Sequence, residues 1–574
     1  MTRLSPLLFA LLFCAFSSSA ADDPYLWLEE IQGENALVWA REQNERTFDE
    51  LRDNEVFRQL YEEAYGILMS DARIPDGNII GGHYYNFWQD EVHVAGVWRR
   101  SPLEKVLTGS PEWETVLDID ALREAENENW VYQDNDCIGG DSDRCLIEMS
   151  RGGRDESVHR EFSLQTRSFV VGGFVVPEAK STTQWLGEDA LLVATDWGDR
   201  LTNSGYPLDV RLWKRGTQLH ESKPLFKGDV TDTLLAPQVV SNDGADYAFI
   251  VRLYADWNER EYVRIENGKP GEVMDWPLRT NLLGVLDGRI ILSIEQDWQQ
   301  GESSYNSGDI IAYELGCGTT ELVFSPDDKQ AVSEVALGAT RLYVALLDNV
   351  VGRVKRISRT DGRWQDVNIE LPDNGVAKIV SSSSSRDDAF VTYESSIQPT
   401  TLYYIDAEDA ITSVAALPHL YDATDVIIRQ EFATSADGES VPYFLIGQKQ
   451  VLDEGNAATI LYGYGGFAIP ILPVYYENPS RPQHGALAGR MWISRGGALA
   501  LGNMRGGGEY GPRWHQAALR ENRQLAYDDY FAIAEDLIDS GIAAPDRLGA
   551  LGRSNGGLLL GVALTQRPDL FTAL

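Results

Sequence analysis

A serine in a glycine-rich turn near the end of the chain is the residue best suited to do chemistry. Ser554 stands in the run Gly552–Gly557, which reads Gly-Arg-Ser-Asn-Gly-Gly. An apolar segment, Leu548–Leu551, precedes this run, and another, Leu558–Leu564, follows it. The pattern predicts a strand, a sharp turn and a helix, which together raise a serine hydroxyl above the edge of a sheet as a nucleophile.

A serine hydroxyl needs a general base, and none stands in the usual place in this sequence. In hydrolases built on such a turn, the catalytic acid and histidine follow the serine. All seven histidines of the chain precede it: His83, His93, His159, His220, His419, His484 and His515. We expect neither His484 nor His515 to be catalytic, because the order would be reversed. The sequence therefore predicts a nucleophile without its base.

Acyl transfer also needs hydrogen-bond donors that stabilise the developing oxyanion. One is usually the backbone N–H of the residue after the nucleophile, which is Asn555 here. A second comes from a loop after an earlier strand, and the glycine-rich segment Tyr462–Phe467 follows a predicted strand.

Gly506–Gly511 matches a dinucleotide-binding pattern, but it stands late in the chain and Pro512 follows at once, so we interpret it as a structural turn.

Acidic residues, the overall charge and the cysteine and histidine spacing argue against several other functions. Asp528 and Asp529 lie near the expected start of a helix, where the dipole favours carboxylates, and we expect no catalytic role for them. The formal net charge of -39 argues against binding nucleic acid or anionic lipid. No cysteine or histidine spacing suggests a metal site, and no cofactor is expected.

The first twenty residues resemble an export signal. A basic start precedes the apolar run from Leu7 to Phe16, and small residues up to Ala20 offer a cleavage site. We expect residues 1–20 to be removed and the protein to be periplasmic or secreted, with no membrane span. Cys137 and Cys145 flank a short turn and could form a disulfide in such a compartment.

The remaining chain divides into three predicted regions. Residues 21–75 have helical periodicity from Pro24 to about Ser70. Residues 76–420 contain short strands separated by turns, in about seven units of roughly 45–50 residues, which favours a β-propeller over a pair of β-sandwiches. Residues 421–574 alternate strands and helices and predict an α/β sheet that carries the serine turn. We expect the propeller to be inserted into the α/β domain.

The strands expected in the propeller region are rich in aromatic and β-branched residues. They are His83–Trp88, Val92–Trp98, Leu191–Thr195, Tyr247–Leu253, Arg289–Ile294, Arg341–Leu347, Ala389–Tyr393 and Thr401–Ile405.

With these motifs identified, the chain resembles the prolyl oligopeptidase family of serine peptidases. The resemblance is carried by Tyr462–Phe467, Arg505–Gly511, Gly552–Gly557 and Gln566–Phe571, and near the other end by Asp23–Glu29. It implies a seven-bladed propeller on an α/β-hydrolase domain, and a cavity that admits short peptides.

The resemblance also implies roles for particular residues. Ser554 would be the nucleophile, and the Asn555 N–H and the Tyr464 hydroxyl would form the oxyanion hole. Phe467 would contribute to an apolar pocket for the residue before the scissile bond. We expect a monomer without a cofactor that cleaves short peptides after proline.

The family's aspartate and histidine would follow Ser554, where this sequence has only twenty more residues. We therefore expect a C-terminally truncated hydrolase domain and no appreciable activity. Two alternatives stay open. One is cleavage after arginine or lysine, as in the oligopeptidase B group. The other is a non-catalytic propeller that binds a partner and keeps a relic hydrolase lobe.

Overall fold

The computed structural model describes residues 23–574 except 31, 53, 139–141, 199, 243, 255–257, 373–374 and 480–487. The expected export signal and His484 lie outside the described residues. The chain forms two compact units, Met1–Gly66 and Ile67–Leu574.

The first unit is helical, as its periodicity predicts. A short 3-10 turn at Leu26–Glu29 precedes α1 (Glu34–Leu51), and α2 (Glu55–Leu68) begins in this unit. Phe57, Tyr61 and Tyr65 follow one another at four-residue spacing on α2, and neighbouring rings stack with centroids 6.2 and 6.3 Å apart. Among the helices of the described chain, none has the length and apolar character to cross a bilayer.

Seven antiparallel sheets make up most of the second unit. The first three blades contain β1 (Gly77–Ile80), β2 (His83–Trp88), β3 (Val97–Pro102) and β4 (Glu114–Asp118); β5 (Trp130–Cys137), β6 (Arg144–Arg151), β7 (Ser157–Ser163), β8 (Ser168–Phe169) and β9 (Val175–Ala179); and β10 (Thr182–Trp185), β11 (Ala190–Ala194), β12 (Asp209–Lys214) and β13 (Lys223–Lys227). Two short helices, α3 (Leu103–Leu107) and α4 (Ile119–Glu126), accompany the first blade.

The other four blades have the same four-stranded plan. They contain β14 (Leu234–Asn242), β15 (Ala245–Leu253), β16 (Arg260–Glu266) and β17 (Lys269–Val273); β18 (Thr280–Leu286), β19 (Arg289–Ile294), β22 (Ile310–Tyr313) and β23 (Thr320–Phe324); β24 (Gln330–Leu337), β25 (Arg341–Asp348), β26 (Val351–Thr360) and β27 (Arg363–Ile369); and β28 (Val376–Ser382), β29 (Ala389–Glu394), β30 (Thr401–Ile405) and β31 (Ile411–Ala416). The small hairpin of β20 (Trp298–Gln300) and β21 (Ser303–Tyr305) projects from the fifth blade.

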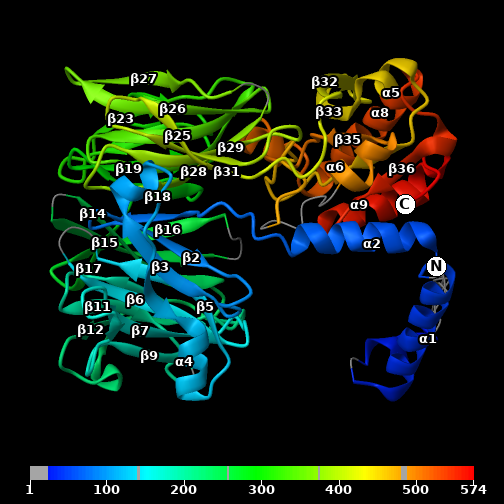
Figure 1. Ribbon diagram of the computed structural model, residues 1–574. Helices are drawn as coiled ribbons and strands as arrows, with labels where there is room; N and C mark the ends of the chain where they lie inside the picture. The colour runs from blue at the N-terminus through cyan, green and yellow to red at the C-terminus, as the bar shows by residue number, and fades with distance from the viewer. Residues whose placement is uncertain are drawn as a thin grey trace, which may run out of the picture. The chain divides into compact units, whose positions relative to one another are not determined.

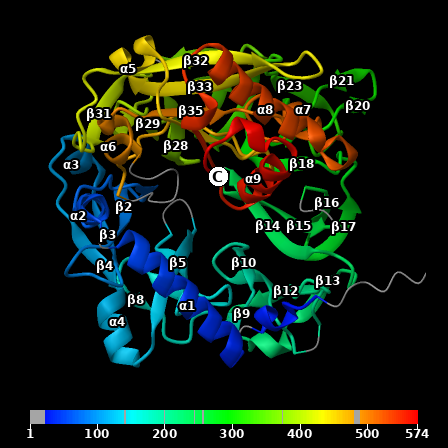
Figure 2. The same cartoon turned by 90° about the vertical axis from the view of Figure 1, so that its right-hand side faces the viewer.

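The structure is a seven-bladed propeller, which confirms the predicted period and excludes the β-sandwiches. Figure 2 shows the blades following one another from β2 and β3 through β5, β10 and β14 to β28 and β29. Three predicted strands, His83–Trp88, Arg289–Ile294 and Thr401–Ile405, have the same bounds as β2, β19 and β30. The predicted strand Val92–Trp98 is wrong in its first five residues. Strand β3 begins only at Val97, because Asp90 Oδ1 accepts the backbone N–H groups of Val92 and His93 and holds a turn.

Side chains on the first strands of several blades bond to the backbone of the next blade. The side-chain oxygen of Gln184 accepts the Val239 N–H at 3.2 Å, and the side-chain amide of Gln238 donates to the Leu282 backbone carbonyl at 3.0 Å. Between the last and first blades the contact is apolar, with the Tyr84 and Phe390 rings 4.7 Å apart. These contacts fix the relative positions of neighbouring blades.

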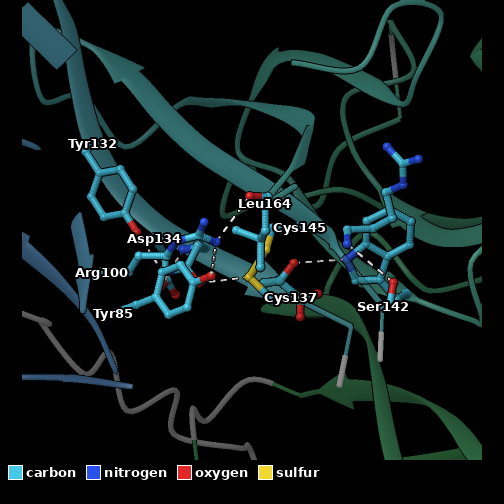
Figure 3. Close-up of a disulfide and its surroundings, with 12 residues drawn as sticks. Tyr85, Arg100, Tyr132, Asp134, Cys137, Ser142, Cys145 and Leu164 are labelled. Carbon is cyan, nitrogen blue, oxygen red and sulfur yellow. Dashed lines mark hydrogen bonds between the residues drawn. A yellow bond between two sulfur atoms is a disulfide. The ribbon is translucent and has the colours of Figure 1, made fainter. Parts of the chain in front are cut away.

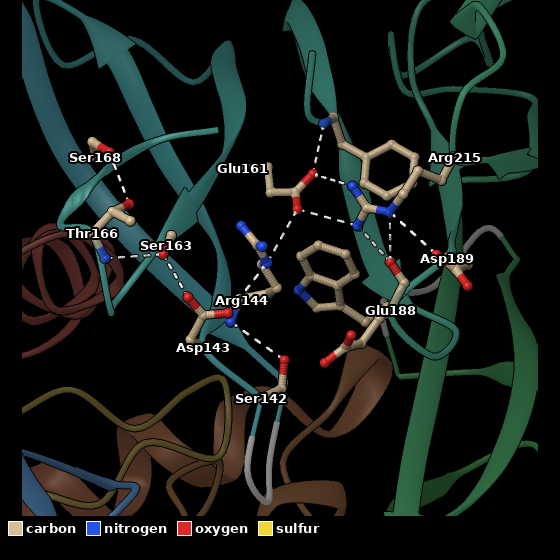
Figure 4. Close-up of polar contacts among 12 residues, drawn as sticks. Ser142, Asp143, Arg144, Glu161, Ser163, Thr166, Ser168, Glu188, Asp189 and Arg215 are labelled. Atoms are coloured by element: carbon tan, nitrogen blue, oxygen red, sulfur yellow. Dashed lines mark hydrogen bonds and ion pairs between the residues drawn. The ribbon is translucent and has the colours of Figure 1, made fainter. Parts of the chain in front are cut away.

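A disulfide and a buried ion pair stabilise the second blade. Cys137 and Cys145 are directly opposite each other on β5 and β6 and are joined by a disulfide (Figure 3). On β7, the fully buried carboxylate of Glu161 binds Arg215, from the next blade, through two contacts of 2.9 and 3.1 Å (Figure 4). Glu161 also accepts the Phe174 N–H at 2.9 Å, so the buried charge is paired and hydrogen-bonded.

The α/β sheet follows the propeller in the chain (Figure 1). Its strands are β32 (Val426–Thr434), β33 (Ser440–Gln448), β34 (Thr459–Tyr462), β35 (Ala498–Gly502) and β36 (Leu548–Leu551), in the order β32-β33-β35-β34-β36. The helices are α5 (Lys449–Glu454), α6 (Ala488–Met491), α7 (Pro512–Gln516), α8 (Gln524–Asp539) and α9 (Asn555–Gln566).

The predicted α/β alternation is confirmed. β32 and β33 pair antiparallel around a turn at residues 435–439, whereas β34 lies parallel to both β35 and β36. Three hydrogen bonds of 2.8 Å join this domain to the fifth and sixth blades: Tyr510 and Gln430 bind Asn349, and Gln516 binds the Glu295 carbonyl.

Candidate active site

The turn at Ser554 has the predicted strand–turn–helix geometry. Ser554 lies between β36 and α9 with φ 58° and ψ -117°, a backbone conformation that residues other than glycine rarely adopt. A Cβ at Gly552 would lie 2.4 Å from the Gly556 carbonyl oxygen, and one at Gly556 would lie 2.7 Å from that of Gly463. Glycine is therefore required on both sides of the serine, as in a nucleophile elbow.

The glycine-rich loop after β34 is fastened to the first turn of α9. The Asn555 side chain donates to the Tyr464 carbonyl at 2.5 Å. A Cβ at Gly466 would lie 2.5 Å from the same Asn555 amide nitrogen, so the loop passes directly over it. As the first residue of α9, Asn555 has a backbone N–H with no acceptor in its own helix. The two predicted oxyanion donors thus belong to segments in direct contact.

Arg523, just before α8, was not identified by sequence reasoning. Its guanidinium donates to the Gly465 carbonyl at 2.5 Å and to the Asn555 side-chain oxygen at 3.2 Å. It therefore holds both the loop and the helix that carries Ser554. Nothing in the local sequence indicates this role, because Arg523 is separated from its partners by 32 to 58 positions.

Ser554 and Tyr464 line one cavity of about 780 Å³. The α/β domain supplies most of its wall, which is apolar and aromatic: Ile460, Tyr462, Ile469, Pro470, Ile471, Leu472, Val474, Tyr476, Met491, Trp492, Leu499, Leu501 and Leu551, with Arg553 beside the serine. The propeller supplies Ser333, Glu334, Leu347, Val376, Ala377 and Lys378. A pocket of this size and character is typical of sites for small ligands.

Phe467 lies elsewhere. It is 72% exposed, has a left-handed φ of 55°, and does not line this cavity. The apolar wall near Ser554 is instead formed by residues such as Tyr476 and Trp492, which sequence reasoning did not select. The predicted role of Phe467 in substrate binding stays a prediction.

The loop from Arg505 to Gly511 is a buried polar structure, which agrees with its interpretation as a structural turn. Arg505 contacts buried Asp529 at 2.6 Å and Asp437 at 2.5 Å, and its hydrogen bond lowers the pKa of Asp437. Asp529 lies in the body of α8 rather than near its start, and it accepts three hydrogen bonds from Arg505 and one from Ser435. Asp529 is therefore explained by its contacts with Arg505, and not by a favourable interaction with the helix dipole as the sequence predicted.

No histidine among the described residues lines the Ser554 cavity. His515 Nδ1 lies 2.7 Å from the Gly506 carbonyl oxygen and 3.1 Å from the Ala468 nitrogen, and the shorter contact fits a proton donated to the carbonyl. The Ala468 N–H donates to the same Gly506 carbonyl at 3.2 Å, so the two loops meet at that oxygen. The described chain also contains no cluster of His, Cys, Asp or Glu that could hold a metal ion.

These features define a class of protein: an α/β hydrolase with a serine on a nucleophile elbow, whose cavity is completed by a seven-bladed propeller. Two family models match the chain. The prolyl oligopeptidase N-terminal β-propeller domain matches residues 15–416, and the prolyl oligopeptidase family model matches residues 488–574. The chain belongs to the prolyl oligopeptidase family and is a serine-type peptidase.

Individual relatives agree with this assignment. The chain is 36% identical to the uncharacterised peptidase y4nA of Sinorhizobium fredii, over 97% of this chain and 78% of the relative. It is 29% identical to the prolyl endopeptidase of Elizabethkingia miricola, over 41% of this chain and 32% of that enzyme. The structure of a post-proline cleaving enzyme from Rickettsia typhi matches with a TM-score of 0.85 and 29% identity, over 95% of this chain and 81% of that one.

Proposed function

We propose that this protein cleaves short peptides on the carboxyl side of proline, through an acyl-enzyme on Ser554. The observation that carries the proposal is the wall of the Ser554 cavity, which is mainly apolar and aromatic. A pyrrolidine ring can be buried against such a wall without an unpaired polar group. The likeness to a post-proline cleaving enzyme and to a prolyl endopeptidase supports the same preference.

Charge argues against the alternative of cleavage after arginine or lysine. A cationic side chain buried in the cavity needs a carboxylate partner. In the described wall of the cavity, Glu334 is the one carboxylate, and it accepts the Ile379 N–H at 2.7 Å. An arginine beside Ser554 would therefore compete for a carboxylate that already bonds the backbone of the neighbouring blade.

The proposed mechanism uses groups that the fold holds in place. The Ser554 oxygen attacks the peptide carbonyl, and its proton passes to a general base. The Asn555 N–H and the Tyr464 hydroxyl donate to the oxyanion of the tetrahedral intermediate. The intermediate collapses to an ester on Ser554 as the protonated base gives its proton to the leaving amine. Water then hydrolyses the ester and restores the Ser554 hydroxyl. Arg523 acts indirectly, by positioning the Tyr464 loop against α9.

The preference for proline is testable by binding, which needs no general base. We expect the Ser554→Ala variant to bind acetyl-Ala-Ala-Pro at least about tenfold more tightly than acetyl-Ala-Ala-Arg, since burying an unpaired guanidinium costs more than 1.4 kcal/mol. Isothermal titration calorimetry measures both affinities. Trp492→Ala, which removes an aromatic face of the cavity, should weaken binding of the proline peptide. Equal or tighter binding of the arginine peptide would refute the proposal.

We further propose that these 574 residues alone have no appreciable peptidase activity, because no described histidine lines the Ser554 cavity. Turnover of a fluorogenic Gly-Pro peptide should stay at the background rate, since a serine hydroxyl without a base is a poor nucleophile. Turnover that disappears in Ser554→Ala would contradict this. In that case, a base from within the chain reaches the serine.

We propose that the protein is exported and acts as a monomer on peptides. The basic and apolar start of the chain and the Cys137–Cys145 disulfide support an oxidising compartment. Fractionation of cells that express the tagged protein tests its location. The sedimentation coefficient tests the oligomeric state.

A further inference from the structure

The wall of the Ser554 cavity as a whole has a charge unlike that of the rest of the molecule. The chain contains 88 acidic and 49 basic residues, not counting histidine. In the described wall of the cavity, however, the charged residues are one acid, Glu334, and two bases, Lys378 and Arg553. A local excess of positive charge in a strongly acidic protein favours an anionic group on the ligand.

Glu334 is held by the backbone of its neighbouring blade. Strand β24 has an irregular register between Val332 and Glu334, and such bulges redirect side chains next to functional sites. From this position the Glu334 carboxylate accepts the Ile379 N–H of β28 at 2.7 Å. The single acid of the wall therefore contributes to joining the sixth and seventh blades.

Lys378 is the residue before Ile379 on β28. Its neighbour Ala377 packs in the apolar core beside β25 and β29, whereas Lys378 is exposed and lines the cavity. Within the described residues, the Lys378 ammonium makes no ion pair with a carboxylate. The hydrogen bond at Ile379 fixes the strand that carries it, so the cation is presented to the cavity from a rigid element.

We propose that Lys378 is a specificity-determining residue that binds the C-terminal carboxylate of a short peptide whose scissile bond lies at Ser554. The proposal rests on the proposed function, because it takes a short peptide as the substrate. Every peptide with an unmodified C-terminus carries one α-carboxylate, whereas an acidic side chain is present in only some peptides. The cavity has Ser554 on the α/β side and Lys378 on the propeller side. Peptides with a free C-terminus are therefore preferred over amidated peptides and over long chains.

The test compares three peptides by calorimetry on the Ser554→Ala protein: acetyl-Gly-Pro-Ala-Ala as the free acid, the same peptide as the amide, and acetyl-Gly-Pro-Ala-Glu amide. The free acid should bind about tenfold more tightly than either amide, as expected for a hydrogen bond between charged groups. Lys378→Met should reduce this ratio to nearly one, and Lys378→Arg should keep most of it. Lys227→Met, an exposed lysine on β13, is the matched control and should leave the ratio unchanged.

The outcomes separate this proposal from the proposed function. An acid-to-amide ratio near one, or a ratio that persists in Lys378→Met, overturns the carboxylate subsite. If the glutamate amide binds as tightly as the free acid, the assignment to the C-terminus is overturned. Replacing proline by arginine in all three peptides tests the proline preference independently, because the acid-to-amide ratio is measured within each set.

Discussion

At the scale of single residues, Ser554 is held in a backbone conformation that costs stability. Ser554 has a positive φ, which suits glycine, and such residues cost about 1–3 kcal/mol each. The close contacts around Gly552 and Gly556 leave the chain little freedom to relax. The turn that positions the Ser554 hydroxyl therefore lowers the free energy of unfolding of the protein.

This cost is measurable by comparing two variants that both lack the hydroxyl. We expect Ser554→Gly to be more stable than Ser554→Ala by about 1 kcal/mol, because glycine adopts φ 58° without strain. Urea unfolding measures the difference. At Ser540, where φ is -74°, the order should reverse, with alanine more stable than glycine. The same order at both positions would contradict a strained turn at residue 554.

At the scale of elements, the loop after β35 is organised around a buried acid. Glu509 is 1% exposed; its Oε1 accepts the Ile471 N–H at 3.0 Å and a longer contact from Asn503 at 3.4 Å. Burial raises the pKa of Glu509 from its usual 4.5 to about 7. The loop is therefore built around a carboxyl group that is neutral in mild acid.

This raised pKa predicts a pH-dependent stability. Between pH 4.5 and 7 the Glu509 carboxyl is ionised in the unfolded chain but still protonated in the folded chain. The protonated carboxyl therefore contributes its full stabilisation below pH 4.5, and this contribution to the free energy of unfolding is lost as the pH rises to 7. Between pH 5 and 8, the free energy of unfolding should fall by roughly 2–3 kcal/mol more in the wild type than in Glu509→Gln. Urea unfolding at both pH values measures this, and parallel pH profiles for the two proteins would be inconsistent with a buried neutral acid.

At the scale of the whole molecule, polar contacts between blades supplement the apolar packing of the propeller. Glu161 in the second blade is fully buried and binds Arg215 of the third blade (Figure 4). Removing one partner of such a pair leaves a buried charge that is only partly compensated. Contacts of this kind fix neighbouring blades and, through them, the propeller wall of the cavity.

We expect Arg215→Met to destabilise the protein by about 3 kcal/mol, because Glu161 would lose its bidentate partner. Thermal unfolding measures the loss. Lys105→Met is the control: Lys105 and Glu112 form an exposed pair, which should contribute less than about 1 kcal/mol. The double variant Glu161→Leu, Arg215→Met should recover part of the loss. A variant Arg215→Met as stable as Lys105→Met would show that the buried pair does not join the blades.

Much of this architecture was predictable because it is encoded locally. The turn-separated strands predicted seven blades, and the glycines around Ser554 predicted the elbow, since glycine is the residue that tolerates a close backbone approach. The start of β3 was misplaced because Asp90 binds two backbone N–H groups that a β-rich segment would otherwise use. Propensity predicts a strand, but a single side chain can end its pairing.

The sequence by itself determined the propeller and the turn at Ser554, and it predicted the nucleophile and the oxyanion loop, because each depends on residues that are close together in the chain. Only the tertiary structure decided what surrounds Ser554. Arg523 joins Gly465 to Asn555, Tyr476 and Trp492 line the cavity, and Lys378 lines it from the propeller. These residues are tens to hundreds of positions from their neighbours in space. Their proximity results from the packing of sheets and blades, which no local pattern records.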